Sequence, residues 1–97
     1  ANKKMAEIIW TKWAIKDLKS IFDFVSIDSK FYATRFIESI ITRVDQLIIY
    51  PHSGRIVPEK NNPIIRELIY GNYRIIYKIN KSKITILRIH NSARRIK

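Results

Sequence analysis

Basic side chains recur through the last third of the chain, residues 66–97. This segment holds nine lysines and arginines, one histidine and a single acid, Glu67, among the β-branched and aromatic residues that favour strands. Guanidinium groups bind phosphates and carboxylates through planar, bidentate contacts. An imidazole titrates near neutral pH. The segment therefore predicts an anion-binding surface, and an RNA-cleaving site if His90 acts there as a general acid or base.

The alternation of side chains along a strand predicts which of these groups share a face of the sheet. In residues 73–79 the odd-numbered side chains are apolar or aromatic and are predicted to face the core. The opposite face is predicted to meet a partner or nucleic acid through these residues: Arg66, Arg74, Lys78, Arg88, His90, Arg94 and Arg95. In a nuclease, Arg74 or Arg88 would stabilise the pentacovalent phosphorane. The alternative for His90 is a strand-end histidine that bonds to backbone.

Other kinds of site find little support in the sequence. The two histidines and the scattered acids lack the spacing of metal ligands, and two glycines in all cannot form a Gly-rich phosphate loop. His52 lies in a Pro-Ser-Gly context typical of a plain loop. Trp10 and Trp13 flank the start of a predicted helix, where core or rim packing is favoured over an interaction handle. We predict neither a metal nor a cofactor.

The elements that position the basic residues are readable from hydrophobic periodicity. Residues 6–10 form a short apolar strand, and apolar residues then recur at spacings of three and four through 12–26 and 30–49. These two amphipathic helices form an antiparallel hairpin, and Pro51 ends the second. Residues 51–63 form a loop, with a brief extended stretch at 55–57. Strands at 64–70, 73–79 and 83–90 follow, the first pair joined by a Gly-Asn turn.

The predicted fold class is α+β, in the order β-α-α-β-β-β. The helical hairpin covers one face of a small antiparallel sheet and leaves the other face free. A length of 97 residues predicts one domain over residues 1–97. The absence of cysteine, of a secretory signal pattern and of an apolar run near 20 residues is consistent with the cytoplasm.

The charge of the chain is strongly positive and unevenly distributed. The formal net charge is +11, and residues 51–97 carry eleven basic and two acidic side chains. Residues 1–50 carry eight basic and six acidic side chains. Such one-sided charge favours an acidic partner, either nucleic acid or an acidic protein segment, over a merely solubilising surface.

Four segments together resemble the RelE/ParE superfamily of toxins from bacterial type II toxin–antitoxin modules. They are TKWAIKDLKSI, LIIYPHSGRIV, IIRELIYGNYRIIYKI and ILRIHNSARR, and the resemblance spans about residues 6–96. It implies a helical hairpin on a small antiparallel sheet, in agreement with the periodicity. It also implies a toxin of a plasmid-stabilisation type of module, which inhibits growth and is neutralised by a cognate antitoxin that wraps the helices and sheet.

The superfamily divides into two functional groups. RelE-like members are ribosome-dependent mRNA endonucleases, whereas ParE-like members poison DNA gyrase. Arg74 matches a catalytic arginine of RelE-like nucleases, and Arg88 and His90 fall where some nuclease members keep arginine and histidine. The chain lacks their late tyrosine, and Glu59 and Lys60 lie in a loop rather than in a Lys-x-Lys or base-glutamate motif.

The resemblance therefore favours a ParE-like toxin that acts on gyrase by binding and is not an enzyme. The first alternative is a RelE-like endoribonuclease that acts on mRNA in the ribosome. The second alternative is a non-toxic basic module that binds nucleic acid or an acidic peptide.

Overall fold

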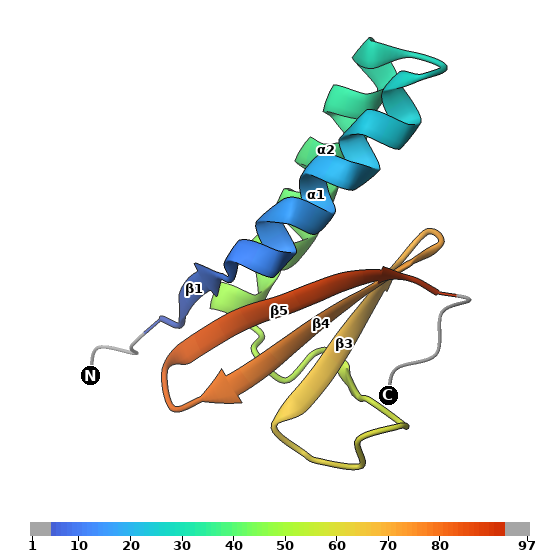
Figure 1. Ribbon diagram of the computed structural model, residues 1–97. Helices are drawn as coiled ribbons and strands as arrows, with labels where there is room; N and C mark the ends of the chain where they lie inside the picture. Colours follow the sequence, from blue (N-terminus) through green and yellow to red (C-terminus); the bar gives the residue numbers. More distant parts are fainter. Residues whose placement is uncertain (1–4, 93–97) are drawn as a thin grey trace.

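The computed structural model describes residues 5–92, in which a helical hairpin lies on one face of a five-stranded sheet (Figure 1). The α+β class, the helical hairpin and the succession of the last three strands are as predicted. Helix α1 spans Lys12–Ser26 and helix α2 spans Lys30–Asp45. Both begin at a hydroxyl cap, because Thr11 Oγ1 accepts the Ala14 N–H at 3.0 Å and Ser29 Oγ accepts the Tyr32 N–H at 3.1 Å.

The second helix is shorter than predicted. It ends at Asp45, and a 3₁₀ turn, η1 (Gln46–Ile48), follows instead of the predicted continuation to residue 49. Leu47 within this turn is fully buried, so the apolar periodicity continues although the helix type changes. Tightening of a last turn is common where the chain must leave a helix, and Pro51 lies three residues beyond η1.

The sheet has the strand order β1-β5-β4-β3-β2. Its strands are β1 (Glu7–Trp10), β2 (Arg55–Ile56), β3 (Ile65–Tyr70), β4 (Tyr73–Asn80) and β5 (Lys83–Asn91). Strands β2 to β5 pair antiparallel, whereas β1 runs parallel to β5, a pairing that the hydrophobic pattern did not reveal. The brief extended stretch predicted at 55–57 is β2, which adds a short edge strand.

The main core lies between the helices and one face of the sheet. On β4 this face presents Ile75, Tyr77 and Ile79, which are buried together with Ile40 and Val44 of α2. Nearer the β3–β4 turn, the ring of Phe36 packs 5.7 Å from Tyr70 and 5.9 Å from Tyr73. The prediction that the aromatic and apolar set of β4 faces the helices is confirmed.

A β-bulge keeps the last strand in phase with that core. Ile76 pairs with Arg88 but Tyr77 pairs with Ile86, so Leu87 is an extra residue on β5. Ile84 and Ile86 before the bulge and Ile89 after it all belong to the buried cluster. Simple alternation would have placed Arg88 on the same face as Ile86, and the extra residue moves it to the opposite one.

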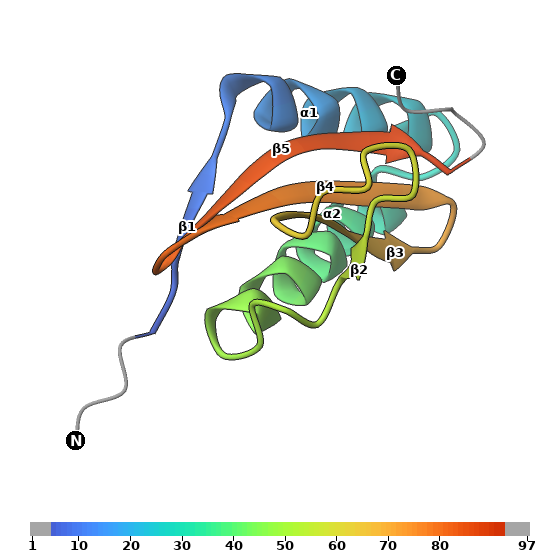
Figure 2. The ribbon, with the colours of Figure 1, turned by 90° about the horizontal axis from the view of Figure 1, so that it is seen from below.

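The face of the sheet away from the helices is partly covered. The segment between β2 and β3 passes beneath the strands while the helices lie above them (Figures 1 and 2). Val57 is fully buried and Ile76 is 5% exposed, and neither belongs to the cluster beneath the helices. The prediction of an entirely free second face is therefore wrong, because a second small buried layer occupies part of it.

Candidate functional site

Four of the predicted site residues do share the helix-free face. Strand pairing sets Arg74 opposite His90 and Ile76 opposite Arg88. Cross-strand partners project to the same side, so Arg74, Arg88 and His90 lie on one face. Lys78, opposite Thr85, is exposed on the same face. The prediction that Arg74 and Arg88 lie on one side of the sheet is confirmed.

Arg74 is nevertheless not an open guanidinium. It is only 6% exposed, and its Nε donates to Glu67 Oε1 at 2.7 Å. Its Nη1 and Nη2 donate to the two carboxylate oxygens of Glu59, each at 2.8 Å. The prediction of an outward-pointing Arg74 is corrected for this reason: two carboxylates lie against it, one from the neighbouring strand and one from the covering loop.

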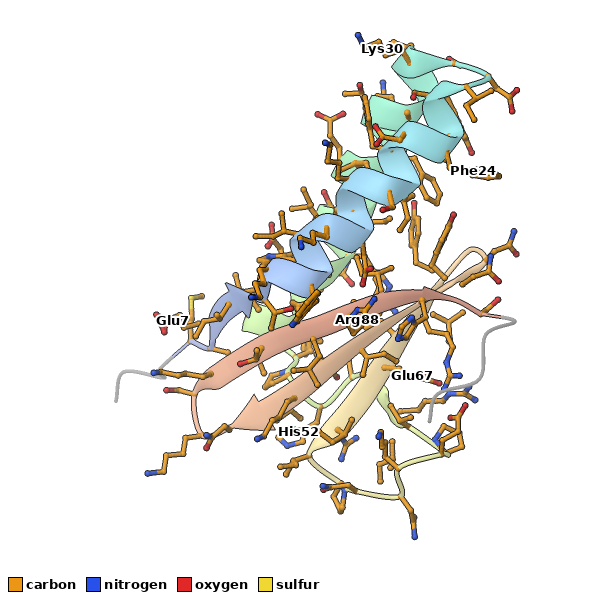
Figure 3. All side chains as sticks on the ribbon, in the orientation of Figure 1. Glu7, Phe24, Lys30, His52, Glu67 and Arg88 are labelled. Atoms are coloured by element: carbon orange, nitrogen blue, oxygen red, sulfur yellow. The ribbon has the colours of Figure 1, made fainter. Side chains whose placement is uncertain are left out.

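A second arginine, Arg55, joins this charge network from the surface, with its side chain 62% exposed. The side chain of Glu67 is fully buried, and its Oε2 accepts from Arg55 Nε at 2.5 Å (Glu67 is labelled in Figure 3). Among residues 5–92, this network sets the arginines Arg55 and Arg74 against the carboxylates Glu59 and Glu67. The hydrogen bonds to Glu59 are the main cause that raises the pKa of Arg74, and Glu67 adds to it, so the guanidinium stays protonated.

Arg88 binds helix α1 instead of standing free. Its Nε and Nη2 donate to the carboxylate of Asp17 at 2.9 and 3.1 Å, and the Ile89 N–H donates to the same carboxylate at 2.8 Å. These hydrogen bonds raise the pKa of Arg88. Its side chain remains 42% exposed, so it keeps part of its surface for a partner (labelled in Figure 3).

Arg66 lies on the other face of the sheet. It is paired with Tyr77, whose side chain faces the helices, so the predicted assignment of Arg66 to the helix-free face is wrong. Its guanidinium donates to the carbonyls of Pro63 at 2.9 Å and Gly54 at 3.1 Å. The prediction assigned Arg66 to the face of the other basic residues because of its charge, whereas its pairing with Tyr77 places it at the rim of the core. There it stabilises the loop before β3.

The remaining predicted residues divide by exposure. His90 is half-buried, and His52 is an exposed loop residue whose carbonyl accepts from Arg66 at 3.4 Å. Trp10 packs half-buried against the core, whereas Trp13 is 50% exposed between Lys12 and Lys16. Arg94 and Arg95 lie outside the described residues.

Tyr77 faces the core as predicted, but the sequence did not reveal the hydrogen bonds of its phenol. Its phenol donates to the Pro51 carbonyl at 2.9 Å and accepts the Gly54 N–H at 2.9 Å. A Cβ at Gly54 would lie 2.5 Å from that phenol oxygen and 2.6 Å from the Glu67 carbonyl oxygen. Burial raises the pKa of Tyr77. The sequence Pro51-His52-Ser53-Gly54-Arg55 therefore binds the buried phenol through its first and fourth residues and places Arg55 against Glu67.

The chemistry open to this face is contact with anions through exposed cations. Lys78 and Lys83 are exposed on it and Arg88 is partly exposed, whereas the hydrogen-bonding edges of Arg74 are occupied by carboxylates. Within residues 5–92 no three histidine or acidic side chains come together as a metal site. No helix in the same part of the chain has the length and apolarity to cross a membrane.

Comparison with known proteins gives one family and several relatives. Residues 8–96 match the model of the ParE toxin of the type II toxin–antitoxin system parDE. Toxin RelE2 of Caulobacter vibrioides is 33% identical over 91 residues, covering 93% of this chain and 99% of the relative.

Two solved structures share the fold. A chain of the chromosomal ParDE system from P. aeruginosa matches with a TM-score of 0.77 and 24% identity, over 92% of this chain and 98% of that one. A chain of the toxin–antitoxin complex RelBE2 from Mycobacterium tuberculosis matches with a TM-score of 0.67 and 17% identity, over 90% and 98%.

Proposed function

This chain belongs to the ParE toxin family of type II toxin–antitoxin systems, and from that premise we propose that it stops growth by binding DNA gyrase. In this proposal the protein acts by contact rather than by catalysis. Gyrase works in the cytoplasm, which would be the site of action.

The state of Arg74 is the observation that carries the proposal. A nuclease of the RelE-like kind would use this arginine on a phosphate in the transition state. Here Glu59 and Glu67 already accept three hydrogen bonds from its guanidinium, at 2.7 to 2.8 Å. A phosphate would have to displace a carboxylate from a largely buried pair, which is costly. The geometry therefore favours a binding protein.

The second candidate function is endonucleolytic cleavage of mRNA on the ribosome. Two observations favour it: Arg88 and His90 share a face with Arg74, and one relative is named as a RelE toxin. Arg88 is engaged by Asp17, however, so in this candidate two arginines would have to exchange their carboxylate partners for phosphate.

A cognate antitoxin is the second proposed partner. The far end of the helical hairpin extends beyond the sheet (Figure 3, near Phe24 and Lys30). It exposes four large apolar side chains, each at least 59% accessible: Phe24, Ile27, Phe31 and Tyr32. Such a patch is typical of an interaction surface. With a net charge of +11, the chain favours an acidic antitoxin segment that supplies apolar side chains for this tip.

Induced expression with two readouts separates the candidate functions. Gyrase poisoning predicts double-strand DNA breaks and filamentous cells with intact mRNA. The nuclease candidate predicts mRNA cut within codons, and cutting abolished by His90→Ala. A copy of the gene with an early stop codon controls for induction. Cut mRNA without DNA breaks would overturn the proposed function, and normal growth would favour the non-toxic binding module.

A further inference from the structure

Glu59 contacts Arg74 with the bidentate geometry of a bound anionic ligand. Glu67 accepts from the Nε–Nη2 edge of the guanidinium, with contacts from Nε at 2.7 Å and from Nη2 at 2.6 Å. Glu59 takes the other edge through Nη1 and Nη2, both at 2.8 Å. Two parallel N–H to oxygen bonds of this kind are the geometry by which arginine also recognises phosphate.

The two carboxylates differ in how they are held. Glu67 is part of strand β3, and its side chain is fully buried. Glu59 belongs to the segment between β2 and β3 that crosses the helix-free face, and its side chain is 19% exposed. Glu67 is thus a fixed part of the sheet, whereas Glu59 is brought to the arginine from outside it.

The charge balance of the network depends on Glu59. With Glu59 present, two arginines face two carboxylates. If Glu59 lost its charge, Glu67 would be the remaining described carboxylate in contact with both Arg55 and Arg74. The two described arginines would then outnumber the described carboxylates, on the face of the sheet that also carries the exposed Lys78 and Arg88.

We propose that Glu59 is a specificity-determining residue that excludes nucleic-acid phosphates from the site at Arg74. It occupies the Nη1–Nη2 edge of that guanidinium with the chain's own carboxylate. Within residues 5–92, the helix-free face therefore meets protein partners with its exposed lysines, whereas its Arg74 guanidinium is closed to bidentate phosphate contact. This inference goes beyond the proposed action on gyrase, because it concerns RNA binding by the isolated protein.

The test compares two variants that lose the same single charge. Glu59→Gln removes the carboxylate at Arg74, whereas Glu38→Gln removes an exposed carboxylate on helix α2. Binding of each to a labelled oligo(U) RNA is measured by fluorescence anisotropy at several salt concentrations. Thermal unfolding of each variant confirms that it is folded.

Glu59→Gln is expected to bind the RNA about tenfold more tightly than Glu38→Gln, since one new charge-assisted bidentate contact is gained. The slope of log affinity against log salt should steepen by about 0.7, the change expected for one more phosphate contact on a single strand. Affinities that agree within about twofold, with equal slopes, would overturn the proposal.

Two further measurements keep the test decisive. Glu59→Asp keeps the charge but shortens the reach to Arg74, and a smaller gain in RNA affinity is expected; it replaces Glu59→Gln if that variant does not fold. Inorganic phosphate is the second probe, and it should compete away only the added affinity. If phosphate binds Glu59→Gln but RNA affinity is unchanged, the site takes the free ion and the assignment to nucleic acid is wrong.

Discussion

At the scale of single residues, several polar groups of the candidate site are engaged in holding the fold together. Arg74, Glu67 and Glu59 form a buried ion network, and Tyr77 bonds to both ends of the Pro51–Gly54 turn. Buried polar groups of this kind must be satisfied, because each unmade hydrogen bond costs about 1 to 3 kcal/mol. The residues that resemble a functional motif therefore have a structural explanation first.

Gly54→Ala should strongly destabilise the protein. The new Cβ would fall 2.5 Å from the Tyr77 phenol oxygen and 2.6 Å from a strand carbonyl, and the latter cannot move freely. We expect a loss of about 2 kcal/mol in the free energy of unfolding in urea, typical of overpacking. Gly71→Ala is the comparison, because nothing lies within 4 Å of its Cβ and only its φ of +56° costs energy, about 1 kcal/mol. Equal losses of unfolding free energy in the two variants would contradict the tight packing of Gly54 against Tyr77 and Glu67.

Tyr77 should make the protein sensitive to alkaline pH. Its folded-state pKa is raised above 10.0 by burial, so the folded state holds the phenol proton more tightly than the unfolded chain. The stabilisation is complete below about pH 10 and is lost as the pH rises toward the folded-state pKa. Tyr77→Phe removes this dependence.

The measurement is the midpoint of urea unfolding between neutral pH and pH 11 for both proteins. Lysines lose charge in both over this range, so only the difference between the two profiles reports on Tyr77. The wild-type midpoint should fall more steeply than that of Tyr77→Phe; parallel profiles would contradict the assigned burial effect.

At the scale of elements, strand β1 pairs with the first half of the β5 edge, and helix α1 covers the rest of that edge. Pairing of β1 ends at Trp10 opposite Ile86, and Thr11 then donates its N–H to the Ile86 carbonyl at 3.1 Å and its hydroxyl to the Leu87 carbonyl at 2.9 Å. Asp17, one turn and a half into α1, accepts the Ile89 N–H. The helix thus protects a sheet edge that would otherwise be open to other strands.

Asp17→Ala should loosen this edge selectively. It leaves the Ile89 N–H and Arg88 without their carboxylate, at a cost of about 1.5 to 3 kcal/mol. Hydrogen exchange of the Ile89 amide should accelerate more than that of amides in the β3–β4 pair. Asp23→Ala, at an exposed position of the same helix, is the control. Unchanged protection at Ile89 would show that Asp17 does not hold the edge.

The sequence predicted the elements well and their polar contacts poorly. Periodicity placed both helices and strands β3 to β5 within a few residues, because the apolar positions of each element are buried as its period requires. The Leu87 bulge and the parallel β1 pairing depend on contacts between distant residues. Arg66 was misplaced because its register, not its charge, decides its face, and the partners Glu59, Glu67 and Asp17 of the arginines left no periodic signal.

At the scale of the whole molecule, residues 5–92 present two surfaces of different chemistry to partners. The tip of the helical hairpin is apolar, and the helix-free face carries exposed lysines beside neutralised arginines. Such a division allows an antitoxin and a target to contact different surfaces. The overall positive charge would attract acidic partners to both.

Phe31→Ser should weaken antitoxin binding without weakening the fold. Phe31 is 73% exposed, so the stability of the free toxin should change by less than about 0.5 kcal/mol. Loss of a large aromatic anchor from an interface costs about 1 to 3 kcal/mol of binding energy, measured by calorimetry with the cognate antitoxin. Ile15→Ser, 54% exposed on α1 away from the tip, is the control and should bind normally.

The central claim is that this toxin acts on gyrase by binding and leaves RNA intact. The most direct measurement is supercoiling of relaxed plasmid by purified gyrase and ATP with increasing amounts of the purified toxin. The account predicts that supercoiling falls with toxin concentration and that cleaved plasmid accumulates in the gyrase complex. Undiminished supercoiling without plasmid cleavage, at toxin concentrations that arrest growth when produced in cells, would contradict it.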